Sequence, residues 1–227
     1  MFPLHDSRPT KIYPFLTYLI IASNIVVFIL EIISQDVDTF IKQFALIPER
    51  VSFLDYSTLT PFLTSQFLHA GFFHIISNMW FLKIFGDNVE EKFGRIFYLF
   101  VYLLSGVAGG FVQYLFSPNS TIPMLGASGA VAGVLGAYFV FFPHHRIETL
   151  IPTGLFVSTV SIPAGIVLFY WFVTQLFSGV GSIAVAQTGG VAFWAHVGGF
   201  TTGWAIAKLK KDNKLDLEEG EIIEEFW

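Results

Sequence analysis

Six stretches of the chain are almost wholly apolar, and prolines, glycines or charged residues separate them. A run of about 20 apolar residues is long enough to cross a bilayer as a helix. A run of about 14 crosses only with help from flanking residues or from local thinning of the bilayer. The pattern predicts six membrane-spanning helices, at Tyr13–Ile33, Phe72–Phe85, Ile96–Phe116, Ser128–Phe142, Pro163–Phe177 and Val191–Leu209.

The composition agrees with a membrane protein. Of the 227 residues 54% are hydrophobic, 18% are aromatic and only 13% are charged, and the mean hydropathy is +0.65. These values lie far from those of an average soluble domain. The expected fold is an all-α polytopic bundle in one domain, residues 13–209, with a cytoplasmic N-terminal segment at 1–12 and an acidic cytoplasmic tail at 210–227.

The basic residues orient the predicted bundle. With the N-terminus in the cytoplasm, ten of the 12 Lys and Arg residues lie inside and only Lys42 and Arg50 lie outside. Cytoplasmic loops carry such an excess of basic residues. Both chain ends are therefore expected in the cytoplasm, and the outer segments are Ser34–Gly71, Ser117–Ala127 and Ser178–Gly190.

The first outer segment, Ser34–Gly71, is long and rich in apolar residues, but Pro48, Asp55 and Pro61 interrupt it. Irregular backbone at membrane depth must be packed on protein or wet. A partly membrane-embedded loop and a small folded cap outside the membrane both fit this pattern.

The remaining composition excludes several classes of function. The net charge of −5 is a misleading guide to partners, because seven of the 17 acidic residues lie between Asp212 and Glu225. Nucleic acid is not an expected partner. The chain has no Cys, which excludes disulfides and a thiol nucleophile. The first apolar run has no small-residue cleavage site behind it, so we expect it to be retained.

Ser128 begins the fourth predicted span, within the segment Gly126-Ala127-Ser128-Gly129. The ordinary role of a serine at a helix start is to cap it, by accepting a hydrogen bond from a free backbone N–H. The alternative is a nucleophile, because flanking glycines let a substrate backbone approach and let N–H groups face an oxyanion. Gly129 and Gly133 continue a small face on which a neighbouring helix can pack closely.

His196 lies near the start of the sixth predicted span. His196, Gly199 and Gly203 are three and four residues apart, which places them on one helical face. Such a face packs closely against the small face of the fourth span, and this would bring the imidazole within hydrogen-bond reach of Ser128. A histidine that bonds a carbonyl within the bundle is the alternative.

His74 and Asn78 share a face at the outer end of the second predicted span, and both side chains can donate hydrogen bonds. Two donors aimed at one point suit a tetrahedral oxyanion. Polar bonds between helices are the alternative role. His69 and His74 are five residues apart and do not aim at one ion from a helix, and the sequence has no His-Glu-x-x-His pair, so no metal and no cofactor is expected.

Three motifs in separate spans resemble those of the rhomboid intramembrane proteases, namely Gly126-Ala127-Ser128-Gly129, His196 with Gly199 and Gly203, and His69 with His74 and Asn78. The resemblance covers Tyr13–Leu209 and implies a six-helix rhomboid-like bundle. Gly86–Gly94 also looks like a short cytoplasmic turn of that family, with Glu90 four residues before Gly94.

The resemblance implies a role for each of these residues. Ser128 is the nucleophile and His196 is the general base of a dyad without a third, orienting carboxylate. His74, Asn78 and the backbone N–H of Ser128 surround the oxyanion, beside Gly126, and His69 organises the polar cavity nearby. The expected partners are transmembrane protein substrates, cut near the outer face, and the lipid bilayer, in a multi-pass protein of a prokaryotic inner membrane.

Two positions depart from the family pattern. Ala132 stands where some members have an aromatic residue stacked on the histidine, and Thr60-Pro61 where some carry a Trp-Arg pair. Neither position breaks bonds, but the support of His196 is left without an explanation. The alternatives are an inactive relative that binds transmembrane clients, and a transporter or channel, although no span carries the charged residues that usually mark an ion path.

Overall fold

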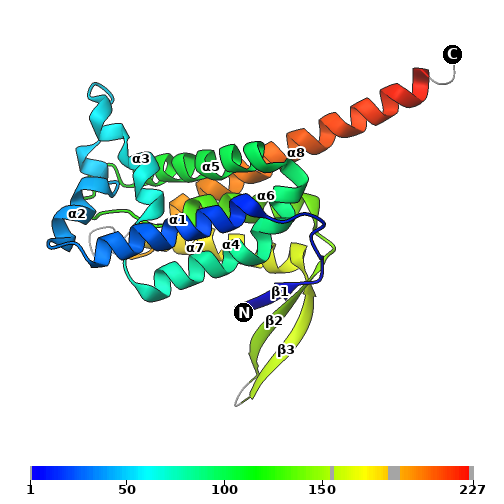
Figure 1. The fold of residues 1–227 in the computed structure, drawn as a ribbon, viewed down its shortest axis with the longest axis horizontal. Helices are drawn as coiled ribbons and strands as arrows, with labels where there is room; N and C mark the ends of the chain where they lie inside the picture. The colour runs from blue at the N-terminus through cyan, green and yellow to red at the C-terminus, as the bar shows by residue number, and fades with distance from the viewer. Residues whose placement is uncertain (1, 154–155, 184–189, 225–227) are drawn as a thin grey trace.

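The computed structural model describes residues 2–153, 156–183 and 190–224, and six helices of at least 14 residues dominate it (Figure 1). They are α1 (Phe15–Ile32), α4 (Phe72–Phe93), α5 (Arg95–Phe116), α6 (Ser128–Phe141), α7 (Ala164–Ile183) and α8 (Phe193–Glu224). Each one contains most of a predicted apolar run. By length and composition, three helices of the described residues can cross a membrane: α1, α5 and the Ala164–Ser182 part of α7. The apolar helix α6 is shorter.

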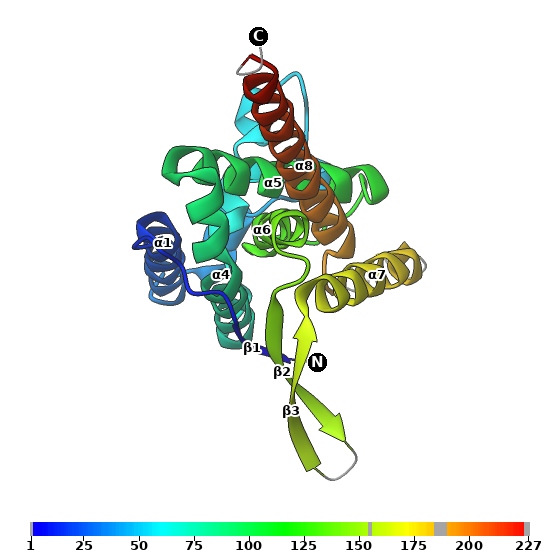
Figure 2. The same ribbon diagram turned by 90° about the vertical axis from the view of Figure 1, so that its right-hand side faces the viewer.

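Helix α6 lies in the centre of the bundle, with α4, α5, α7 and α8 around it in the end-on view of Figure 2. Every residue from Gly129 to Tyr138 is buried. The outer faces of the surrounding helices instead carry exposed large apolar side chains, such as Phe73, Ile96 and Phe177. An apolar exterior around a tightly packed centre is the arrangement that lipid surroundings favour.

Helices α6 and α8 meet almost backbone to backbone. A β-carbon on Gly199 would collide with the carbonyl oxygen of Gly129, and one on Gly203 would collide with that of Gly133. Small residues permit this approach, and close packing is the main force that associates helices in lipid. The contact fixes the first turns of α6 and α8 side by side.

Helix α4 is longer than the second predicted span, which was expected to end at Phe85. It continues to Phe93, so Gly86–Phe93 is helix, and the chain turns only at Gly94, where φ is +79°. The polar residues of this end are satisfied within the protein: the buried carboxylate of Glu90 accepts hydrogen bonds from the backbone N–H groups of Leu16 (3.0 Å) and Thr17 (2.8 Å). These N–H groups lie in the first turn of α1, which has no helical partner for them.

The segment between α1 and α4 folds into short helices at the end of the bundle where α1 ends and α4 begins (Figure 1). They are α2 (Val37–Phe44), η1 (Pro48–Arg50), η2 (Tyr56–Leu59), α3 (Pro61–Thr64) and η3 (Ser65–Phe67). An antiparallel bridge between Leu46 and Met124 and a bond from Gly126 N–H to the Ser65 carbonyl (2.9 Å) attach this segment to the loop before α6. Its depth in a membrane stays a prediction.

A three-stranded antiparallel sheet corrects the all-α expectation, and the chain is mostly rather than wholly helical. The order is β1 (Phe2–Asp6), β2 (Arg146–Thr153) and β3 (Phe156–Pro163), with Ile147 paired to Asp6 and to Ile162. The local sequence, with Pro152 and Pro163, favours a loop. Strand β2 pairs with β3, the next strand along the chain, and with the distant β1 near the N-terminus.

The chain after α7 differs from the expected boundaries. Helix α7 continues to Ile183, so residues 178–183 of the predicted outer segment Ser178–Gly190 are helical, and residues 184–189 lie outside the described part. The tail predicted at 210–227 continues α8 to Glu224, and residues 225–227 lie outside the described part. Figure 1 shows this end of α8 leaving the bundle.

Candidate active site

Ser128 is the first residue of α6, and Ala127 occupies the N-cap position. Gly126 just before it has a φ of +129°, a conformation that favours glycine. The Ser128 hydroxyl makes no hydrogen bond to any residue that the structure describes, neither to the backbone of its own helix nor to His196. The hydroxyl therefore does not serve as a cap, and its oxygen is only partly buried.

His196 lies in the first turn of α8 and is buried. Its Nδ1 is 2.7 Å from the side-chain oxygen of Gln175 on α7. The Trp171 ring, one turn earlier on α7, packs beside the imidazole with the ring centroids 5.7 Å apart. These two contacts come from α7, not from the Ala132 position of α6.

His74 and Asn78 of α4 face the backbone just before Ser128. A β-carbon on Gly126 would lie 2.7 Å from His74 Nε2 and 3.8 Å from Asn78 Nδ2. The backbone N–H of Ala70 donates to His74 Nδ1 at 3.4 Å, which leaves Nε2 as the protonated, donating nitrogen. Asn78 Nδ2 is buried and has no partner among the described residues. Two free N–H donors therefore converge on the start of α6.

His69 completes the group of side chains at this end of α4. Its ring lies edge-on to that of His74, with centroids 5.1 Å apart, and neither of its ring nitrogens has a partner among the described residues. Burial, and then the nearby His74, lower the pKa of His69 to about 4, so the ring is neutral at physiological pH. Its backbone N–H donates to the buried Glu31 of α1 at 3.1 Å.

The structure thus gathers the predicted residues from three helices. Gly126 links Ser128 to His74 and Asn78, and Gly129 links the same turn of α6 to the Ala195 carbonyl, beside His196. A serine hydroxyl, an imidazole and a pair of N–H donors form the set of groups that acyl transfer needs.

Sequence reasoning did not find Gln175, Trp171 or Glu31. A polar glutamine inside an otherwise apolar run is a signal for function, because polar groups are costly in lipid. This signal is present at Gln175. Trp171 lies four positions earlier, on the same helical face. Glu31 lies at the end of the first predicted span, where a carboxylate is ordinarily a solvated residue of the helix end.

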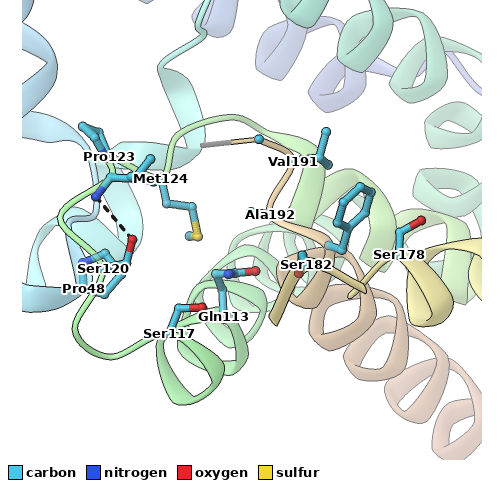
Figure 3. A pocket seen from close by; sticks show the side chains of 13 residues that line it. Pro48, Gln113, Ser117, Ser120, Pro123, Met124, Ser178, Ser182, Val191 and Ala192 are labelled. Atoms are coloured by element: carbon cyan, nitrogen blue, oxygen red, sulfur yellow. Dashed lines mark hydrogen bonds between the residues drawn. The ribbon is translucent and has the colours of Figure 1, made fainter. Parts of the chain in front are cut away.

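A cavity of about 260 Å³ lies beside the start of α8, separate from this group (Figure 3). Polar residues line much of it, namely Gln113 of α5, Ser117 directly after α5, and Ser178 and Ser182 of α7. Neither Ser128 nor His196 is among its lining residues. The cavity offers polar space next to the site but contains none of the predicted catalytic groups.

No three His, Asp or Glu side chains gather into a metal-binding group within the part of the chain that the structure describes. The expectation that the protein needs no metal and no cofactor stays a prediction.

Comparison with known proteins gives a consistent result. A family model described as the Rhomboid domain matches residues 56–212. RHOMBOID-like protein 6, mitochondrial, of Arabidopsis thaliana is 31% identical over 144 residues, which are 63% of this chain and 41% of that protein. RHOMBOID-like protein 1 of the same plant is 27% identical over 230 residues (88% and 54%).

Presenilin-associated rhomboid-like protein, mitochondrial, of Homo sapiens is 32% identical over 133 residues, 58% of this chain and 34% of that protein. The chain thus spans about a third to a half of the length of these three relatives. They come from plants and mammals, and the expected prokaryotic membrane stays a prediction.

Proposed function

This chain belongs to the rhomboid family, and we propose that it is an intramembrane serine endopeptidase that hydrolyses peptide bonds in or near transmembrane segments of other membrane proteins. Ser128 is the nucleophile and His196 is the general base. The contact of Gly199 with Gly129 is the observation that carries the proposal, because it holds the two first turns together. Catalytic hydrogen bonds are often long without substrate, so the open geometry between the hydroxyl and the imidazole is compatible with this role.

The proposed reaction is an acyl transfer to serine followed by hydrolysis. His196 Nε2 takes the proton as Ser128 Oγ attacks the peptide carbonyl carbon. His74 Nε2–H, the Asn78 amide and the backbone N–H of Ser128 donate to the oxyanion that forms. His196 then protonates the leaving amine, and a water molecule that it deprotonates hydrolyses the acyl-enzyme ester.

The proposed topology has six crossings, one for each of α1, α4, α5, α6, α7 and α8, with both chain ends in the cytoplasm. Helix α6 has 14 residues, about 21 Å at about 1.5 Å per residue. The hydrocarbon core is about 30 Å thick, so this helix cannot reach both surfaces. With the C-terminal end of α6 at the cytoplasmic surface, its first residue, Ser128, lies below the outer surface. A substrate helix reaches it there from within the bilayer, and water reaches it past the polar groups of α4.

An inactive relative that binds transmembrane clients is the second candidate. The observation that favours it is the absence of a hydrogen bond between Ser128 and any described residue. The two candidates differ in bond cleavage, which a single assay measures.

Purified full-length protein in liposomes, mixed with a model single-span substrate, tests the proposal. The wild type should cleave, whereas Ser128→Ala and His196→Ala should not. His144→Ala, which changes an exposed residue away from the site, should cleave like the wild type. Equal cleavage by all variants contradicts the dyad, and binding without cleavage by the wild type favours the second candidate.

A further inference from the structure

We infer that Gln175 of α7 is a positioning residue, which holds His196 in the tautomer with the proton on Nδ1 and so leaves Nε2 free to accept the proton of Ser128. This inference rests on the proposed function. It assigns to a neutral amide the orienting role that a carboxylate has in a catalytic triad.

The amide of Gln175 has one favourable orientation. Its Nε2 donates to the Trp171 carbonyl (3.3 Å) and to the Thr174 hydroxyl (3.2 Å). The Thr174 hydroxyl itself donates to the Trp171 carbonyl at 2.6 Å, so its oxygen accepts from the amide. In the flipped orientation, the amide oxygen would face the Trp171 carbonyl oxygen, and two acceptors would meet. The network therefore directs Oε1 toward His196.

The tautomer of His196 follows from that orientation. An amide oxygen only accepts, so the 2.7 Å contact with Nδ1 requires a proton on Nδ1. A neutral imidazole has a single ring proton, and Nε2 is then the basic nitrogen. Both side chains are only 9% exposed, and water does not readily replace the bond.

Trp171 adds to the same support. Trp171 and Gln175 are one turn apart on α7, and both contact the imidazole, by ring packing and by the hydrogen bond. The side chain at position 132 is only a methyl group, so α6 offers no ring to stack on His196. Gln175 and Trp171 of α7 thus orient the base, together with the ring of Phe193 on α8, which lies edge-on to the imidazole with the centroids 6.4 Å apart.

Two substitutions separate the hydrogen bond from packing. Gln175→Leu keeps the approximate volume but removes the acceptor, so the buried Nδ1–H of His196 has no partner. The expected result is a loss of about 5- to 150-fold in kcat/KM, with KM nearly unchanged. Gln175→Glu keeps the acceptor and adds a charge that favours imidazolium, so the acidic limb of the pH profile should move to higher pH by about one unit or more. His74 of α4 is the other titratable side chain of the proposed oxyanion site, and it is the same in all variants.

The matched control is Gln113→Leu, because Gln113 lies on α5 and its amide oxygen has no partner among the described residues. It should keep the wild-type rate and pH profile. Unchanged profiles in both Gln175 variants, with an active wild type, overturn the inference.

A readout without activity distinguishes failure of this inference from failure of the proposed function. Nitrogen NMR of protein labelled at histidine, with His196→Ala for assignment, should show a protonated Nδ1 in the wild type and in Ser128→Ala. Gln175→Leu should show a mixture of tautomers. If the wild type is inactive but Nδ1 is protonated, the proposed protease activity is refuted and the positioning role is supported. If the wild type is active but Nε2 carries the proton, the positioning role is overturned.

Discussion

Gly199 of α8 lies against the carbonyl oxygen of Gly129 of α6 so closely that even a methyl side chain has no room between them. A helix backbone cannot shift at one residue alone, so this contact sets the separation of the two helices along their first turns. The distance between Ser128 and His196 depends on it.

Gly199→Ala should therefore reduce both activity and stability. Overpacking of a tight core costs about 1–3 kcal/mol, and here the opposing atom is backbone, which cannot rotate away. The unfolding midpoint and the cleavage rate of the purified protein measure the two effects. Gly181→Ala is the control, because a β-carbon on Gly181 of α7 meets nothing within 4 Å; wild-type behaviour of both variants would contradict the close contact.

Asn78→Ala should lower kcat by about 10²- to 10³-fold, the usual loss for one oxyanion donor. Stability should not fall, because Asn78 Nδ2 has no partner among the described residues and its removal breaks no bond. Steady-state kinetics with a model substrate and a thermal unfolding curve test the two parts. The adjacent, exposed Ser77→Ala serves as control. An unchanged kcat, or a large loss of stability, would give Asn78 a structural role instead.

Trp171→Leu should lower kcat/KM by about 2- to 10-fold, because an aromatic pair contributes about 0.5–1.5 kcal/mol beyond its buried area. The loss should appear in kcat, since the ring orients His196. Phe177→Leu changes another aromatic residue of α7, one that is exposed, and should have no effect. Equal rates for both variants would show that the imidazole does not need the Trp171 ring.

Glu90→Gln should destabilise the protein by about 1–3 kcal/mol, because an amide replaces one of the two acceptor oxygens by a donor. Glu90 is fully buried, and its two oxygens accept from Leu16 N–H, Thr17 N–H and the Thr17 hydroxyl. Unfolding in mixed micelles gives the change in free energy. Glu49→Gln, at an exposed position, is the reference, and a loss no larger than the reference would refute the role of Glu90 at the start of α1.

The link between β1 and the bundle should depend on pH. Burial raises the pKa of Asp6 above its ordinary value of 3.8, against the opposing hydrogen bond from Tyr138. A carboxyl with a raised pKa in the folded chain contributes stability that is complete below the unfolded pKa and is lost as the pH rises through the folded pKa. As the pH rises from about 4 through the raised folded pKa, the wild type should therefore lose stability relative to Asp6→Asn.

Asp36→Asn provides a comparison of opposite sign. Hydrogen bonds from Thr39 lower the pKa of Asp36, so its contribution is present above the unfolded pKa and is lost as the pH falls. Unfolding midpoints measured over the same pH range decide both cases. A difference between the wild type and Asp6→Asn that does not change with pH would contradict the buried state of Asp6.

The sequence by itself determined the helices, because hydrophobic runs and their interruptions are local properties. Phe15–Ile32, Arg95–Phe116 and Ser128–Phe141 fall almost where the apolar runs predict. Spacing along a helix also placed Gly199 and Gly203 on one face with His196, and the structure puts that face on Gly129 and Gly133.

Only the tertiary structure decided what lies between elements. The partner of His196, Gln175, depends on how α7 is rotated against α8, and no periodicity within either helix encodes that rotation. Contacts between distant segments also decided the pairing of Phe2–Asp6 with Arg146–Thr153 and the extension of α4 to Phe93. The local sequence around Glu90 indicates the end of a span. In the fold, the Glu90 carboxylate accepts hydrogen bonds from N–H groups of α1, which is distant in the sequence.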